Sequence, residues 1–161
     1  MAAWKVMDVS RLREIYLFKN LSERVLGEVA ALAYTEEFNR GEKIVSEGEA
    51  GDKFYLILSG EVRISKTIVG IGEEALAILK PGNYFGEMAL LDDESTRSAD
   101  ATADKRCTLS VITRRDLEQL LSQNKDLAYE LLWSFVRTLS SRLRETNAKM
   151  TFLAAAGKFD R

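Results

Sequence analysis

The chain has 161 residues, of which 46% are hydrophobic and 30% charged, and its formal net charge is −2. This length predicts one globular domain with its own core, and the acidic balance lacks the lysine and arginine excess that a nucleic-acid-binding chain needs. The sequence contains no histidine and one cysteine, Cys107, so the commonest metal ligand and general base are missing. We therefore expect no metal, no cofactor, no nucleic acid bound by this chain alone, and no enzymatic activity.

The chain also lacks the pattern of a membrane or exported protein. No apolar run approaches the roughly 20 residues that span a bilayer, and the start turns charged too early for a signal peptide. We expect a cytoplasmic protein without a membrane anchor.

Residues 8–34 predict helical structure. Val25, Val29 and Leu32 recur at helical spacing, and Ser22 stands where the cap of a second helix is expected.

Residues 38–113 carry short apolar runs broken by glycines and acidic turns. Cys107, Leu109 and Val111 alternate with polar residues, which predicts a strand with one buried face and a buried cysteine. Pro81 and Gly82 mark a turn between two strands. Several short strands at this spacing predict an antiparallel β jelly-roll barrel or sandwich, and with helices on both flanks the fold class is α+β.

Helical texture returns after Thr113. The spacing of Thr113 and Asp116 predicts a capping box for a short helix that buries Leu117, Leu120 and Leu121. We expect this helix to close a domain over residues 1–124.

A long helix with a short tail is predicted over residues 125–161. Residues 125–156 contain neither proline nor glycine, and steps of three and four residues connect Tyr129, Leu132, Val136, Leu139, Leu143, Thr146, Met150 and Leu153. A second apolar set lies beside this seam and comprises Leu131, Trp133 and Phe135. The helix thus needs two partners, its own barrel and a second copy, which favours a homodimer over a monomer with one wide amphipathic helix.

The segment from Tyr84 to Ala103 combines a glycine, a carboxylate and a guanidinium with many small residues. If residues 87–91 begin a helical turn, their free amides face the space in front of Gly86 and favour an anion. Arg97 offers a fork of donors suited to phosphate, with the Ser98 hydroxyl beside it. Glu87 can only accept hydrogen bonds when ionised, so it suits a sugar hydroxyl.

Phosphate plus ribose is the simplest ligand that satisfies both groups. Room for it is left by the small residues Ala89, Ala99, Ala101 and Ala103. The alternative is that Arg97 pairs with Asp92, Asp93 or Glu94 on a solvated loop, an arrangement that implies no ligand. Spacing alone leaves both interpretations open.

The stretches "GDKFYLILSGEVRI" and "FGEMALL", followed by Arg97, Ser98 and Ala99, resemble the cyclic-nucleotide-binding domain of catabolite activator proteins, kinase regulatory subunits and cyclic-nucleotide-gated channels. The resemblance implies an eight-stranded jelly roll whose cassette grips the cyclic phosphate and ribose of cAMP or cGMP. The matching cassette positions are Gly86, Glu87, Met88, Ala89, Arg97, Ser98 and Ala99.

The resemblance also implies individual roles. Gly86 and Ala89 would offer backbone amides, Glu87 would accept the ribose 2′-hydroxyl, and Arg97 would pair with the phosphate beside Ser98. Structural turn glycines match at Gly48, Gly51 and Gly60. Asp100 departs from the family pattern, in which a neutral residue is usual near the phosphate loop.

The stretch "RLRETNAKMTFLAAAG" resembles the end of the activators' dimerisation helix, where two polar residues contact adenine. Here the pair is Thr146 and Asn147, which implies that the helix is also a lid and that cAMP is preferred over cGMP. We expect a sensor that signals by moving this helix, with an effector that the sequence does not name. One alternative is the front part of a DNA-binding regulator whose helix-turn-helix domain is absent from this chain, and another is a domain that has lost its ligand.

Overall fold

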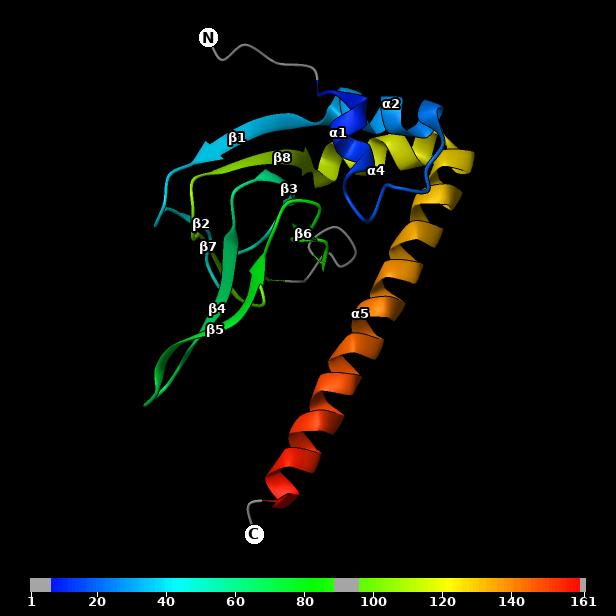
Figure 1. Cartoon of the computed structure of the whole chain (residues 1–161). Helices are drawn as coiled ribbons and strands as arrows, with labels where there is room; N and C mark the ends of the chain where they lie inside the picture. The colour runs from blue at the N-terminus through cyan, green and yellow to red at the C-terminus, as the bar shows by residue number, and fades with distance from the viewer. Residues whose placement is uncertain (1–6, 89–95, 160–161) are drawn as a thin grey trace.

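The computed structural model describes residues 7–88 and 96–159 (Figure 1). The described strands are β1 Tyr34–Phe38, β2 Lys43–Val45, β3 Lys53–Ser59, β4 Val62–Ile68, β5 Gly72–Leu79, β6 Tyr84–Phe85, β7 Asp100–Ala103 and β8 Cys107–Thr113. They form two antiparallel sheets, in the orders β1-β8-β3-β6 and β2-β7-β4-β5. The predicted α+β class and antiparallel jelly roll are confirmed.

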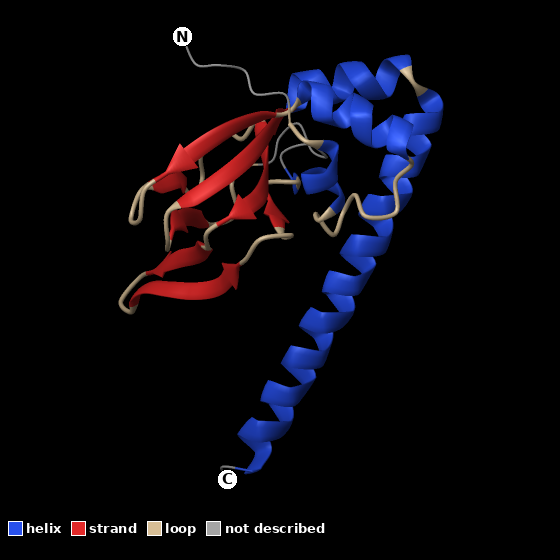
Figure 2. Cartoon of the chain, turned by 45° about the horizontal axis from the view of Figure 1, so that its top comes forward, coloured by secondary structure: helices blue, strands red, loops and turns tan. Residues whose placement is uncertain are grey.

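Four described helices flank the strands: α1 Val9–Arg13, α2 Glu23–Leu32, α4 Arg114–Gln123 and α5 Lys125–Phe159. The first three gather at one end of the barrel, and α5 runs from that end along one side (Figure 2). Helix α5 meets the strands at two places, through Phe135 against Phe54 of β3 and through Arg142 at β6.

The N-terminal helices follow the predicted caps. The Ser22 side chain accepts a hydrogen bond from the Val25 amide (3.4 Å), and α2 buries Val25 and Val29 while Leu32 is only half-buried. Turns separate α1 from α2, and β1 already begins at Tyr34, four residues before the strand-rich section was expected.

Strand β8 lies in the middle of its sheet and is buried on more than the predicted face. Cys107, Leu109 and Val111 are fully buried as expected, and burial raises the pKa of the Cys107 thiol. Ser110 is also fully buried, because Met7 covers the other face and its sulfur contacts the Ser110 hydroxyl at 2.8 Å. The prediction of a single buried face was therefore wrong for the second half of this strand.

The two C-terminal helices are joined without a loop. Thr113 caps α4 by accepting from the Asp116 amide (3.2 Å) and donating to its carboxylate (2.7 Å), which confirms the capping pair. Asn124 ends α4, and its side-chain oxygen accepts from the Leu127 amide (3.0 Å) to start α5.

Helix α5 is buried only in its first turns. Leu127, Leu131 and Phe135 pack in the core beneath α1 and α2. The predicted seam lies open in this chain: Tyr129, Leu132, Val136, Leu139, Leu143, Met150 and Leu153 are all exposed. Trp133, expected beside Leu131 and Phe135, is instead 45% exposed and contacts Tyr129 edge-on. That expectation was wrong because Trp133 lies more than half a turn from the buried stripe.

Two turn glycines allow the close approach of β3 and β8 to be tested. Gly60 has a φ of +85°, and a Cβ there would lie 2.2 Å from the Arg106 carbonyl oxygen, whereas Gly41 has a φ of +86° with open space around it. We expect Gly41→Ala to cost about 1 kcal/mol of unfolding free energy from its backbone alone. Gly60→Ala adds a backbone clash and should cost at least about 3 kcal/mol. Denaturant unfolding of both variants measures the difference, and equal costs would contradict the packing described.

Candidate functional site

Arg97 precedes β7 and carries its guanidinium into the barrel wall. The residue is 8% exposed, and its Nη2 donates to the Lys53 carbonyl oxygen (2.8 Å) while Nη1 lies 3.5 Å from the Gly86 carbonyl oxygen. The guanidinium also lies 5.8 Å from the centre of the Tyr55 ring. Among the described residues no carboxylate pairs with Arg97. A buried cation thus keeps donors free for an anion, since a guanidinium has five.

Gly86 fits this arginine because it has no side chain. Its φ is +83°, and a Cβ would lie 2.6 Å from Arg97 Nη1 and 2.9 Å from the Lys53 carbonyl oxygen. The preceding Phe85 stacks on Tyr55, with ring centres 4.8 Å apart, and holds β6 against β3. The position therefore requires glycine on both backbone and steric grounds.

The backbone of Arg97 is fixed by the loop after β2. The Arg97 amide donates to the Glu49 carbonyl oxygen, and the Gly48 amide donates to the Arg97 carbonyl oxygen, both at 2.8 Å. Gly48 and Gly60 have the positive φ expected of turn glycines, whereas Gly51 does not. The loop thus positions the arginine through main-chain atoms.

A cavity brings the predicted cassette residues together. It is lined by Gly86, Glu87, Met88, Arg97, Ser98 and Ala99, together with Val45, Ile64, Phe85, Thr96 and Ala101. Helical backbone begins at Met88, as the anion-binding turn requires. Ala89 lies outside the described residues, as do Asp92, Asp93 and Glu94, so the loop-pairing alternative for Arg97 falls there as well.

Glu87 makes a contact that the sequence did not predict. Its carboxylate is 3.1 Å from Nη1 of Arg142 on α5, and Arg142 also donates to the Tyr84 carbonyl oxygen (3.2 Å) and covers the Tyr84 ring at 4.1 Å. Arg142 lies two helical turns after Phe135, so continuing the buried stripe of α5 was the available signal. The arginine connects the carboxylate of the cassette directly to the long helix.

Thr146 and Asn147 lie one turn beyond Arg142. Both are exposed in the single chain, and neither lines the cavity. Their contact with a base stays a prediction.

Asp100 is not among the residues that line the cavity. Its carboxylate accepts from the Glu47 amide (2.7 Å) and from Lys43 Nζ (3.1 Å), and these contacts hold the Asp100 pKa below its usual range. The departure from the family pattern therefore has a structural use, because Asp100 ties β7 to the β2 loop that positions Arg97.

Comparison with known proteins identifies the family. The Cyclic nucleotide-binding domain family matches residues 35–124, more than half of the chain. The chain belongs to this family. Its members are defined by ligand binding rather than catalysis.

Individual relatives and solved structures agree with this family assignment. The chain is 36% identical over 126 residues to the Cyclic AMP receptor protein of Thermus thermophilus, covering 77% of the chain and 56% of the relative. It is 34% identical over 114 residues to a cAMP-dependent protein kinase regulatory subunit of Mycosarcoma maydis, covering 68% of the chain and 22% of the relative. A cyclic nucleotide-binding domain from Methylobacillus flagellatus superposes with a TM-score of 0.76 at 28% identity, covering 88% of this chain and 79% of that one.

Catabolite activator protein of Thermus thermophilus superposes with a TM-score of 0.73 at 32% identity, covering 86% of this chain and 62% of that one. The chain thus spans between 22% and 56% of the length of these curated relatives.

Two further observations concern the described residues only. None of their helices is both long and apolar enough to cross a membrane. Their acidic and cysteine side chains form no cluster that could hold a metal ion.

The low pKa of Asp100 predicts a pH dependence of stability. Because the folded-state pKa lies below the unfolded value of about 3.9, the stabilisation is complete above that value and is lost as pH falls through the folded pKa. Asp100→Asn should therefore be less stable than wild type at neutral pH, and the two should converge in acid. Glu74→Gln, an exposed change on β5, serves as the control. Thermal unfolding across pH measures this, and a constant difference would refute the assigned contacts.

Proposed function

We propose that this chain is a cyclic-nucleotide sensor and that Arg97 is the centre of its ligand site. The observation that carries the proposal is a buried guanidinium with free donors, beside Gly86 in a cavity lined by small residues. Among the described residues Arg97 has no carboxylate partner, and a buried cation in this state favours an anion that can enter the cavity. We propose no catalytic role for any residue.

In this proposal the cationic Arg97 binds the phosphate of the ligand, and the anionic Glu87 binds its ribose. The cyclic phosphate would pair with Arg97, with the Ser98 hydroxyl and the amides of Gly86 and Ala89 as further donors. The ribose 2′-hydroxyl would donate to Glu87, which already lies in the cavity wall. Glu87 would then serve the ribose and Arg142 at once.

We propose that α5 reports the ligand through this shared carboxylate. Arg142 joins Glu87 to α5 and has no other described carboxylate within ion-pair distance. A ligand that moves Glu87 would therefore change the contact that holds α5 against β6. Differential contacts of this kind are what allow a ligand to shift a conformational equilibrium.

The exposed seam of α5 supports a homodimer. Its large apolar residues continue for about five helical turns beyond the short buried region, and no described part of the chain covers them. Contiguous apolar surface at heptad spacing favours pairing with a second copy of the same helix. Pairing would also place a second chain near Thr146 and Asn147.

An alternative is the sensor part of a DNA-binding transcription regulator. A CRP-like cAMP-activated global transcriptional regulator of Mycobacterium tuberculosis is 28% identical over 137 residues, and the chain covers 59% of its length. Sequencing the gene beyond Arg161 distinguishes the two, because a helix-turn-helix domain there would favour the regulator.

Replacement of the phosphate-binding arginine tests the proposed ligand site. We expect Arg97→Ala to weaken cAMP binding by about 2–5 kcal/mol, as when one partner of a buried charged pair is removed. Arg144→Ala removes the same charge from an exposed position of α5 and should leave binding unchanged. Calorimetric titration measures both, with circular dichroism to verify folding. Near wild-type affinity in Arg97→Ala would mean that the arginine is only structural.

A charged substitution in the exposed apolar seam of α5 tests the proposed homodimer. Leu143→Asp should convert a dimer to a monomer, because an unpaired carboxylate is not tolerated in a helix-pair core. Leu76→Asp, an equally exposed leucine on β5, should not change the mass. Light scattering reads the mass directly, and a wild-type chain that is monomeric with and without nucleotide refutes the proposal.

Base preference is tested at the two polar residues of α5. Thr146 and Asn147 can both accept hydrogen bonds from the adenine amino group, whereas guanine presents a carbonyl at that position. We expect cAMP to bind more tightly than cGMP by about 1–3 kcal/mol, and the double change to alanine to shrink this gap. Competition binding of both nucleotides decides, and a gap untouched by the double variant would show that α5 does not recognise the base.

A further inference from the structure

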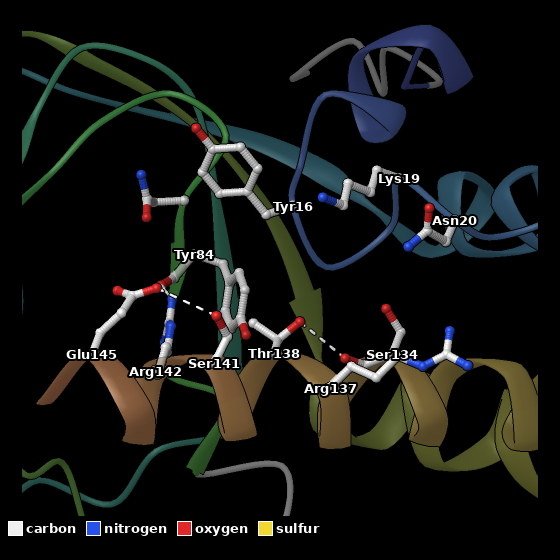
Figure 3. Close-up of a pocket in the computed structure, with 11 residues that line it drawn as sticks. Tyr16, Lys19, Asn20, Tyr84, Ser134, Arg137, Thr138, Ser141, Arg142 and Glu145 are labelled. Carbon is white, nitrogen blue, oxygen red and sulfur yellow. Dashed lines mark hydrogen bonds between the residues drawn. The ribbon is translucent and has the colours of Figure 1, made fainter. Parts of the chain in front are cut away.

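Beyond the core, helix α5 carries hydroxyl residues in place of buried apolar ones. Leu131 and Phe135 are buried, but Ser134, Thr138 and Ser141 follow along the side that faces the body of the chain. These hydroxyl residues form one wall of a cleft of about 420 Å³, and the segment between α1 and α2 forms the opposite wall (Figure 3). We call this space the hydroxyl cleft. It shares no lining residue with the cassette cavity.

The charges around the hydroxyl cleft are mostly positive. Lys19, Arg137 and Arg142 line it, against one carboxylate, Glu145. Arg142 is neutralised by Glu87, but neither Lys19 nor Arg137 forms an ion pair with a carboxylate among the described residues. Arg137 lies 5.7 Å from the centre of the Trp133 ring, a contact through its face that leaves its donors free.

A buried tyrosine forms part of the same cleft wall. Tyr84 lines the cleft and is 1% exposed, and its hydroxyl has no hydrogen-bond partner in the part of the chain that the structure describes. Figure 3 shows its ring between Arg142 and Thr138. The Thr138 hydroxyl already donates to the Ser134 carbonyl oxygen at 2.9 Å. The Tyr84 hydroxyl lies beside Thr138 and is shielded from the cleft, so the tyrosine shapes the cleft wall and does not offer a donor to a ligand.

We propose that the hydroxyl cleft is a second ligand site, which binds a small molecule carrying a phosphate-class oxyanion. Arg137 and Lys19 supply both the charge and the hydrogen-bond donors, since the Ser141 hydroxyl already donates to the Glu145 carboxylate at 3.3 Å. The volume lies within the range of about 300–1,000 Å³ that is usual for small-molecule sites, so the occupant is inorganic phosphate or a small phosphate ester. The proposal does not depend on cyclic-nucleotide binding, because the two cavities are separate.

The test is a titration of the whole chain with inorganic phosphate and with glycerol 3-phosphate at low salt. Because phosphate could also occupy the cassette, it is carried out on wild type, on Arg97→Ala and on wild type saturated with cAMP. We expect saturable binding in all three. Arg137→Gln should weaken it at least about tenfold, the loss of one charge-assisted hydrogen bond, and Lys19→Gln should weaken it less. Arg144→Gln, an exposed change on the same helix, should leave it unchanged.

The outcomes separate this site from the cassette. Binding that survives Arg97→Ala and fails in Arg137→Gln supports the hydroxyl cleft, even if the chain binds no cyclic nucleotide. Tighter binding of glycerol 3-phosphate than of phosphate identifies an ester as the occupant, and the reverse order identifies free phosphate. The proposal is overturned if no saturable binding occurs, if binding depends on Arg97 and not on Arg137, or if Arg144→Gln weakens it as much as Arg137→Gln.

Discussion

The burial of the Arg97 guanidinium is the constraint on which the rest of the site depends. A cation in the barrel wall is costly unless its donors are satisfied, and here the carbonyl oxygens of Lys53 and Gly86 satisfy part of them. This contact explains why position 86 must be glycine and why the loop at Gly48 pairs with the backbone of Arg97. It also explains the contacts of Asp100, which fix that loop to β7. In the function we propose, an anionic ligand would satisfy the remaining donors.

The second organising contact joins the site to the long helix. Arg142 binds the carboxylate of Glu87 and the carbonyl oxygen of Tyr84, so α5 approaches the barrel at the same two-residue strand that leads into the cassette. On the N-terminal side of this contact Leu127, Leu131 and Phe135 pack on the core, and beyond it α5 has no described residue in the core, with Thr146 and Asn147 exposed. One of the contacts that position α5 therefore belongs to the candidate site. This geometry suits a helix whose position depends on the ligand.

Local chemistry made much of this structure predictable. The caps at Ser22 and Thr113, the turn at Gly82 and the burial of Cys107, Leu109 and Val111 depend on neighbouring residues, and each was found. The cassette residues that the structure describes also share one cavity, because Arg97 contacts the carbonyl oxygens of Gly86 and of Lys53.

Features that depend on distant residues were missed. The pair between Glu87 and Arg142 joins positions 55 residues apart, and the burial of Ser110 depends on Met7, 103 residues away. Neither partner has a local pattern that identifies the other. Trp133 was misplaced because apolar character does not by itself indicate which side of a helix is covered. The hydroxyl cleft likewise forms between α5 and a segment more than a hundred residues earlier in the chain, between α1 and α2.

The most direct test of the account is a crystal structure of the chain with cAMP. The account predicts that the exocyclic oxygens of the cyclic phosphate lie within hydrogen-bond distance of Arg97, with the ribose 2′-hydroxyl on Glu87 and the Arg142 contact retained or shifted with α5. A nucleotide bound elsewhere, or an Arg97 guanidinium that makes no contact with the phosphate, would contradict it.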